Sequence, residues 1–168
     1  STYIDAISVV MLIAISIVGL MVAIYSTGYM QGEDRYGWYF AVLSLFVAAM
    51  LLLVTSGSLV WMYVAWEGVG LASYLLIGHY WERQSAAEAA KKAFITTRVG
   101  DVGLLIGIIL LWKATGSFDI QTIIAAATSG QIGETYLTIA MLALFAGAVG
   151  KSAQFPLHVW LPDAMEGP

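Results

Sequence analysis

The sequence predicts an all-α membrane protein, a polytopic bundle of about five transmembrane helices whose last helix is broken near Pro156. Hydrophobic residues make up 60% and charged residues 11% of the 168 residues, whereas a soluble domain has roughly 45–50% apolar and about 25% charged residues. The apolar residues form long continuous runs without the period-two alternation of barrel strands. Pro156 lacks a backbone N–H and clashes with the preceding turn, so it interrupts the last run.

A helix needs about 20 largely apolar residues to cross a hydrocarbon core of about 30 Å. Five runs meet this requirement, over residues 3–25, 38–55, 58–81, 88–112 and 134–155. In the loop before the last run, apolar residues recur with helical spacing over 118–128 and predict a short surface helix. Six aromatic residues lie near the ends of the runs, as in an aromatic belt: Trp38, Trp61, Tyr63, Tyr80, Trp81 and Trp112. Trp66 is deeper and is expected to pack between helices.

Residues 1–168 are expected to form a single membrane domain. The chain starts without an initiator methionine and stops within a predicted turn, so we expect a fragment of a longer protein. Because successive spans alternate in direction, loops 26–37 and 82–87 share one side. With their flanks they carry more basic residues than the other side does (Arg35, Arg83, Lys91 and Lys92 against Lys113). The positive-inside rule places these two loops in the cytoplasm or the mitochondrial matrix.

Four charged residues lie inside the apolar runs. Glu67 is near the middle of the third run, and Lys151 is in the last third of the fifth. Arg98 and Asp101 are at the middle of the fourth. Four unpaired charges at this depth would cost on the order of 10 kcal/mol, because each costs about 2.5–3.5 kcal/mol on insertion scales. All four are therefore expected to face the bundle interior, with partners or water.

Glu67 and Lys151 are the candidate proton-handling pair. Burial favours the neutral form of each group, and a nearby opposite charge favours the charged form. A pair balanced between these two effects gains or loses a proton at small energetic cost, as a proton relay requires. Glycines at positions 68 and 70 leave room beside the carboxylate for a neighbouring helix or a water. The alternative is a fixed ion pair that only positions the helices.

The other candidate site residues have less direct roles. Arg98 and Asp101 are three residues apart and are expected to pair within their own span. Because arginine stays charged, such a pair carries protons poorly and is better suited to setting the local field. Lys92 either extends to the membrane interface or joins the polar chain. His158 follows the break and, as histidine titrates near neutral pH, is either a proton carrier or a hydrogen-bonded bystander.

The break in the last helix adds an argument for ion movement. It leaves carbonyl groups near residues 151–152 unpaired, which a membrane tolerates only inside protein or beside water. Discontinuous helices at mid-membrane are typical of ion-translocating proteins. The break therefore favours a pathway over a static ion pair.

The composition excludes several other classes of protein. Without cysteine, the chain has no disulfide, no cysteine-ligated iron–sulfur cluster and no thiolate metal site. It has no Gly-rich phosphate loop and no His/Cys ligand cluster, so no cofactor or metal site is expected in it. The net charge of −4 and the lack of a Lys/Arg patch exclude nucleic acid as a partner.

Five stretches carry the most specific motifs: residues 25–30 (YSTGYM), 66–78 (WEGVGLASYLLIG), 98–101 (RVGD), 150–154 (GKSAQ) and 160–168 (WLPDAMEGP). In order and spacing they resemble the largest antiporter-like subunit of respiratory complex I, the proton-translocating NADH:quinone oxidoreductase. The match runs over essentially the whole chain. It corresponds to the third through seventh helices of that subunit, the first part of its N-terminal half-channel.

This resemblance implies that Glu67 is the carboxylate at which the channel begins and that Lys151 is its partner on the broken helix. It also implies that Arg98 and Asp101 form the ion pair of the span between them. The implied function is proton translocation coupled to NADH:quinone oxidoreduction by partner subunits, which hold FMN, iron–sulfur clusters and quinone. The expected partners are the other membrane subunits of complex I, the lipid bilayer and protons, or Na⁺. The expected location is the bacterial plasma membrane, or the mitochondrial inner membrane.

Two other functions stay open. The large subunit of multisubunit Na⁺/H⁺ antiporters is a close relative that carries the same glutamate and lysine, although residues 67–70 and 98–101 favour complex I. A non-transporting membrane scaffold, in which the charges only fix helix packing, is the alternative from a different class.

Overall fold

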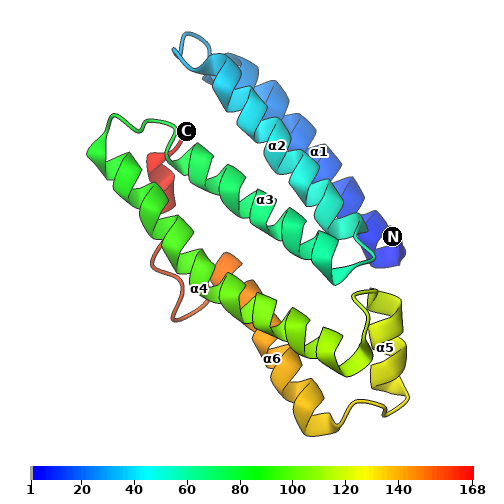
Figure 1. Cartoon of the computed structure of the whole chain (residues 1–168). Helices are drawn as coiled ribbons and strands as arrows, with labels where there is room; N and C mark the ends of the chain where they lie inside the picture. Colours follow the sequence, from blue (N-terminus) through cyan, green and yellow to red (C-terminus); the bar gives the residue numbers. More distant parts are fainter. Residues whose placement is uncertain (1) are drawn as a thin grey trace.

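The computed structural model describes residues 2–168, which fold into six α-helices and a short 3₁₀ helix without a β-strand (Figure 1). The elements are α1 (Ala6–Tyr29), α2 (Tyr36–Thr55), α3 (Leu59–Ile77), α4 (Gln84–Thr115), α5 (Ile120–Thr128), α6 (Glu134–Lys151) and η1 (Asp163–Glu166). The all-α prediction is therefore confirmed. Four helices, α1 to α4, are long and apolar enough to cross a membrane.

The fifth predicted span differs from the expectation. α6 ends at Lys151 rather than at residue 155 and has 18 residues, about 27 Å of helix at 1.5 Å per residue. Glu134 and Lys151 at its two ends dilute its apolar run, and α6 is not among the candidate spans found in residues 2–168. The structure thus has four clear spans and one marginal helix where the sequence predicts about five spans.

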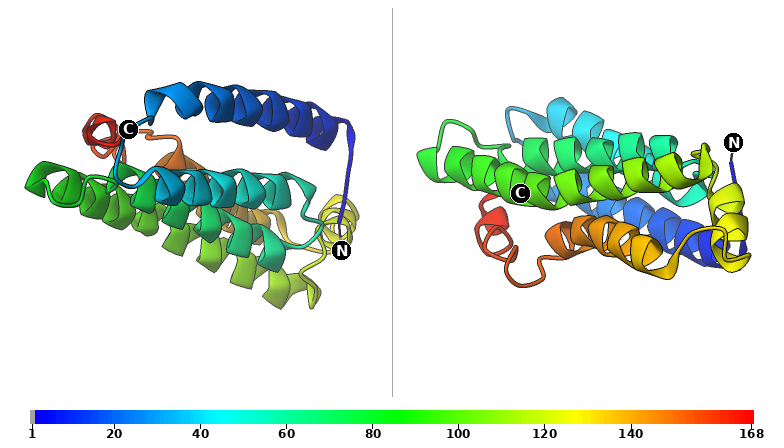
Figure 2. Two further views of the ribbon diagram at one scale, coloured as in Figure 1. Left: turned by 90° about the horizontal axis from the view of Figure 1, so that it is seen from above. Right: turned by 60° about the horizontal axis from the view of Figure 1, so that its bottom comes forward.

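The helices lie side by side in nearly the order of the chain (Figures 1 and 2). α1 and α2 form an antiparallel hairpin, α3 lies against α2, and α4 lies against both α3 and α6. α1 buries only Ser26 and exposes almost all of its apolar side chains, as a lipid-facing helix does. α4 is the central helix, so its residues reach neighbours on two sides.

Small residues let α4 and α6 pack backbone to backbone. A Cβ atom added at Gly100 would lie 2.7 Å from the Ala146 carbonyl oxygen, and one at Gly107 would lie 2.7 Å from the Leu144 nitrogen. Such contacts leave no room for any side chain at these two positions. The close approach brings the middle of α4 next to the last turn of α6.

The predicted surface helix is confirmed as α5, which runs across one end of the bundle (Figure 1). Asp119 caps it by accepting a hydrogen bond from the Thr122 N–H at 3.0 Å. Ile123 of α5 packs into the apolar cluster formed by Leu59, Leu104 and their neighbours. The helix therefore covers the end of the α3–α4–α6 interface.

The break in α6 comes directly after Lys151, five residues before the predicted position at Pro156. Ala153 adopts a left-handed conformation with φ of +50°. The Gln154 N–H donates to the Val149 carbonyl at 3.0 Å and the Ala153 N–H to the Gly150 carbonyl at 3.4 Å, the pattern of a Schellman motif. Small residues end this helix before the proline can, and Pro156 lies in the turns that follow.

Candidate functional site

The four charged residues of the apolar runs form one cluster where α3, α4 and α6 meet. Glu67 belongs to α3, Arg98 and Asp101 belong to α4, and Lys151 is the last residue of α6. Their side chains are at most about one-third exposed, and Asp101 is almost completely buried at 1%. We refer to these four residues as the charge cluster.

The first ion pair of the charge cluster joins α3 to α4. An Arg98 guanidinium N–H donates to Glu67 Oε2, and the guanidinium also lies over the ring of Phe94, 4.5 Å from its centroid. The second carboxylate oxygen, Glu67 Oε1, is buried with no hydrogen-bond donor in place among residues 2–168, although the Tyr63 hydroxyl interacts electrostatically with this carboxylate. One oxygen of Glu67 is thus matched by a permanent cation, and the other is available to a proton or a water.

The second ion pair joins α4 to α6. Lys151 Nζ lies 4.0 Å from Asp101 Oδ2, and the Trp66 indole N–H donates to Asp101 Oδ1 at 2.6 Å. Lys151 Nζ also faces the Trp66 ring, 6.0 Å from its centroid. Trp66 therefore packs between helices, as the sequence predicts, and in addition donates a hydrogen bond to the buried carboxylate.

The structure pairs the four charges differently from the sequence-based expectation. Glu67 pairs with Arg98 and not with Lys151, and Asp101 pairs with Lys151 and not with Arg98. The pairing expected within α4 was wrong because two side chains on one helix face need not contact each other, and Glu67 and Lys151 each pair with a residue of α4 instead. α4 lies between two neighbours, so Arg98 reaches toward α3 while Asp101 reaches toward α6.

Gly70 makes the space that the Lys151 ammonium group occupies. A Cβ atom at Gly70 would lie 2.5 Å from Lys151 Nζ, whereas one at Gly68 would meet the Ala49 side chain of α2 at 3.2 Å. Of the two glycines that follow Glu67, one therefore serves helix packing and the other serves the charge cluster. A cavity of about 20 Å³ next to Gly70 and Lys151 has room for one water molecule, which needs roughly 10–15 Å³.

Lys92 and His158 lie apart from the charge cluster. Lys92 Nζ pairs with Asp163 Oδ2 at 2.6 Å, and both side chains are nearly half exposed. His158 is exposed in the turns after α6 and contacts the Phe155 ring, with the centroids 5.7 Å apart. Within residues 2–168, no hydrogen bond or ion pair connects either residue to the cluster. A role for either one in proton transfer stays a prediction.

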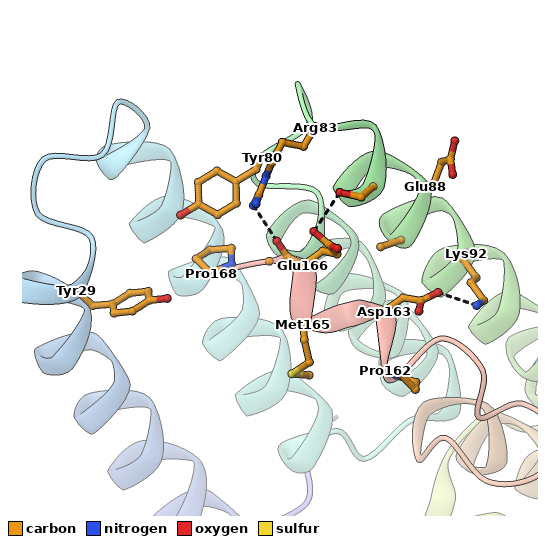
Figure 3. Close-up of a pocket in the computed structure, with 13 residues that line it drawn as sticks. Tyr29, Tyr80, Arg83, Glu88, Lys92, Pro162, Asp163, Met165, Glu166 and Pro168 are labelled. Carbon is orange, nitrogen blue, oxygen red and sulfur yellow. Dashed lines mark hydrogen bonds and ion pairs between the residues drawn. The ribbon is translucent and has the colours of Figure 1, made fainter.

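Lys92 lines an open groove of about 840 Å³ between the start of α4 and η1 (Figure 3). Acidic and basic residues both line it. The Arg83 guanidinium donates to the Glu166 carbonyl at 3.2 Å, and the Ser85 hydroxyl donates to the Glu166 carboxylate at 3.1 Å. These contacts hold the segment after α6 against α4. The same segment is also attached to the end of α6, because the Trp160 indole N–H donates to the Gly150 carbonyl at 3.1 Å.

A second polar contact ties the loops at the same end of the bundle. Arg35 pairs with Glu82, with Nη2 2.8 Å from Oε2, and lies over the Trp81 ring, 3.8 Å from its centroid. The hydrogen bond from Arg35 lowers the pKa of Glu82 to about 2. Next to this pair, His79 is 1% exposed, and burial followed by the nearby Arg35 charge lowers its pKa. This pair links the α1–α2 loop to the α3–α4 turn.

The hydrogen bond from Trp66 to Asp101 and the burial of His79 were not predicted from the sequence. A tryptophan in the middle of an apolar run is a usable signal, because its indole N–H requires an acceptor when it is buried. His79 gave no comparable signal, and the space at Gly70 was predicted beside the Glu67 carboxylate rather than for the Lys151 ammonium group. Within residues 2–168, no group of three or more His, Cys, Asp or Glu side chains is arranged to hold a metal ion.

Two family models match the chain. Residues 56–168 match the model described as NADH:quinone oxidoreductase/Mrp antiporter, transmembrane region, and residues 1–40 match the N-terminus of NADH-ubiquinone oxidoreductase (complex I) chain 5. The chain belongs to this family. The resemblance to the antiporter-like subunit of complex I is thereby confirmed, together with the kinship to the Mrp antiporters.

Members of the family with high identity are subunits of NAD(P)H-quinone oxidoreductases. The chain is 51% identical to the chloroplastic subunit 5 of Carpenteria californica and 52% identical to chain 5 of Synechocystis sp., each over 98% of its length. It spans 23% and 25% of these two relatives, about a quarter of their length.

A solved relative shares the fold. The Mrp complex from Dietzia sp. DQ12-45-1b has a chain with a TM-score of 0.71 and 30% identity, and the match covers 77% of this chain and 14% of that one. Most of the helix arrangement described above is therefore shared with that chain of the Mrp complex.

Proposed function

We propose that the chain is the proton-translocating part of an antiporter-like subunit in an NAD(P)H:quinone oxidoreductase complex. The observation that carries this proposal is the charge cluster, which places two carboxylates, an arginine and a lysine at the junction of three helices. Membership of the NADH:quinone oxidoreductase/Mrp antiporter family supports the same reading, since relatives at 51% and 52% identity are subunits of such complexes.

In this proposal the two ion pairs have different tasks. Glu67 receives a proton on its free oxygen while Arg98 compensates its charge, so the carboxylate stays in place in both protonation states. Lys151 exchanges its proton with the next site, and Asp101, 4.0 Å away, stabilises the charged form of Lys151. In this proposal Glu67 and Lys151 still form the relay, but they do not contact each other. The charges of Arg98 and Asp101, which lie between them, couple the two groups electrostatically.

Redox chemistry is assigned to partner subunits. The chain has no cysteine with which to ligate an iron–sulfur cluster, and we assign FMN, iron–sulfur clusters and quinone to other members of the complex. The membrane is proposed to be a bacterial plasma membrane, with the mitochondrial inner membrane as the alternative. The loops around Arg35 and Arg83 face the cytoplasm or matrix, following the excess of basic residues on that side.

The test is proton pumping by the full-length subunit within its complex. Lys151→Ala and Glu67→Ala should each lower NAD(P)H-driven proton pumping at least tenfold while the complex still assembles, because each change removes a proton-binding group. Lys113→Ala changes an exposed lysine in the last turn of α4, away from the charge cluster at the middle of the helix, and serves as the control. Pumping at wild-type rates in both cluster variants would contradict the proposal.

Na⁺/H⁺ antiport is the second candidate function, because a chain of the Mrp complex from Dietzia sp. shares the fold. It predicts that an imposed Na⁺ gradient drives proton movement without NAD(P)H. A membrane scaffold is the third, and it predicts that a Glu67→Gln, Lys151→Met double variant pumps normally. Each alternative therefore gives a result that the proton-translocation proposal does not.

A further inference from the structure

A pocket of about 270 Å³ lies where the start of α2, the end of α3 and the first turns of α4 meet. Three aromatic side chains wall it, Trp38, Tyr74 and Trp81, and Gly78 and Ala90 belong to its lining. A Cβ atom at Gly78 would lie 3.2 Å from the Ala90 Cβ. α3 and α4 thus approach closely at this point. The pocket lies beside this contact and is bordered by the three aromatic side chains.

Lys91 is the one charged residue that lines this pocket, and no carboxylate lines it. The side chain is exposed and forms no ion pair with any residue from 2 to 168. The nearby Arg35 is already matched by Glu82. The groove of Figure 3 differs, since its Lys92 is paired with Asp163. The pocket therefore combines an apolar aromatic wall with an unmatched positive charge.

The depth of the pocket in the membrane follows from the helix ends. Trp38 is in the first turn of α2, and Gly78 caps the last turn of α3. Tryptophan and tyrosine at the ends of spans lie at the level of the lipid headgroups. Lysine at such a place lays its methylene stem on apolar surface and turns its ammonium group toward the headgroups. An occupant with an apolar body and an anionic head meets both parts of this pocket.

We propose that the pocket binds an anionic phospholipid of the surrounding bilayer, with its phosphate at the Lys91 ammonium group and its upper acyl chain against Trp38, Tyr74 and Trp81. The pocket is smaller than the roughly 300–1,000 Å³ that enclose a whole drug-sized ligand. It therefore holds one end of the lipid, and the remainder stays in the bilayer. The proposal depends on the chain lying in a membrane and is independent of proton transfer.

The experiment uses the full-length protein in its complex, reconstituted in nanodiscs with photoactivatable phosphatidylglycerol or phosphatidylcholine carrying the same acyl chains. Crosslinks are mapped to peptides covering residues 74–91. In the wild type, phosphatidylglycerol should crosslink there in preference to phosphatidylcholine. Lys91→Gln should reduce that preference about fivefold, the effect of one lysine at an anionic surface, and Lys91→Arg should retain it.

Two further variants separate the pocket from surface charge. Ala87→Leu fills the pocket with the charge of Lys91 intact, and should lower the yield of crosslinks to residues 74–91 from both lipids. Lys113→Gln removes an exposed lysine at the opposite end of α4 and should change nothing at these peptides. Equal crosslinking of the two lipids in the wild type, no effect of Lys91→Gln, or an equal effect of Lys113→Gln would each overturn the proposal. Proton pumping is not among the readouts, so these results stand whatever the outcome for the proposed function.

Discussion

Arg98 on α4 pairs with Glu67 on α3 and not with Asp101, which lies three residues further along its own helix. Asp101 instead accepts a hydrogen bond from Trp66 and faces Lys151 of α6. The charge cluster is therefore two interhelical ion pairs that share α4. Each pair links a different neighbour to the central helix.

This arrangement predicts which charges are energetically coupled. In double-mutant cycles, Glu67→Gln and Arg98→Gln should show a coupling energy of about 0.5–3 kcal/mol, as expected for contacting residues. Arg98→Gln and Asp101→Asn should show a smaller coupling, because their side chains face different helices. The measurement is the free energy of unfolding of the full-length subunit by denaturant titration. A larger coupling energy between positions 98 and 101 than between 67 and 98 would show that Arg98 pairs with Asp101 within α4 instead.

Gly70→Ala should displace the Lys151 ammonium group. The added methyl would lie 2.5 Å from Lys151 Nζ, closer than such atoms can approach. Proton pumping per NAD(P)H oxidised should fall several-fold, because Lys151 can no longer hold its position near Asp101. Gly28→Ala is the matched control, since a Cβ atom at that helical glycine meets nothing within 4 Å. Normal pumping by Gly70→Ala would show that the position of the ammonium group is not critical.

The Arg35–Glu82 contact between the two loops should weaken at low pH. Pairing with Arg35 lowers the pKa of Glu82 from its ordinary value of 4.5 to about 2. Since the folded-state pKa is the lower one, the contribution of the pair to stability is present above about pH 4.5 and is lost as the pH falls toward about 2. The protection factors of the amides in residues 30–35 and 78–83, which are exchange rates corrected for the intrinsic rate at each pH, should therefore fall over this window.

Two variants provide the control for the acid effect. Glu82→Gln should have low protection factors in these loops already at neutral pH and should show no further loss of protection in acid. Glu88→Gln removes an equal charge from an exposed residue of α4 whose carboxylate accepts a hydrogen bond from Gln84 rather than from Arg35. The same exchange pattern in both variants would mean that the Arg35–Glu82 pair does not hold the loops together.

Ala153→Gly should stabilise the end of α6. Ala153 has φ of +50°, a left-handed conformation that costs a residue with a Cβ atom about 1–2 kcal/mol. Glycine should recover about 0.5–1 kcal/mol, part of it offset by the greater freedom of the unfolded chain. Ala148→Gly lies within the helix and should destabilise it by about 1 kcal/mol. Denaturant unfolding of the full-length subunit measures both variants, and equal signs would contradict the assignment of the helix end.

The helices were predictable because their apolar runs are long and uninterrupted. The four buried charges were equally visible, since no lipid-facing position can hold them. The short helix over 118–128 was also found, because the spacing of its apolar residues is a local signal. These features depend on residues close together in the sequence.

The pairing of the charges and the end of α6 were not predictable in the same way. The partner of Arg98 depends on where α3 and α6 lie around α4, and that arrangement arises from contacts between distant small residues such as Gly100 and Ala146. The sequence predicts the break at Pro156 because proline is the strongest local signal for the end of a helix. The helix instead ends before Ala153, which adopts a left-handed conformation that is not expected of alanine.

The helix that carries Lys151 ends on that very residue. Aligned peptide dipoles give the C-terminal end of a helix about half of a negative elementary charge. Lys151 therefore has two counter-charges, the Asp101 carboxylate and the terminus of its own helix. A proton can neutralise the carboxylate, but no proton can neutralise the helix terminus. The ammonium group thus keeps part of its electrostatic support through every protonation state of its neighbours.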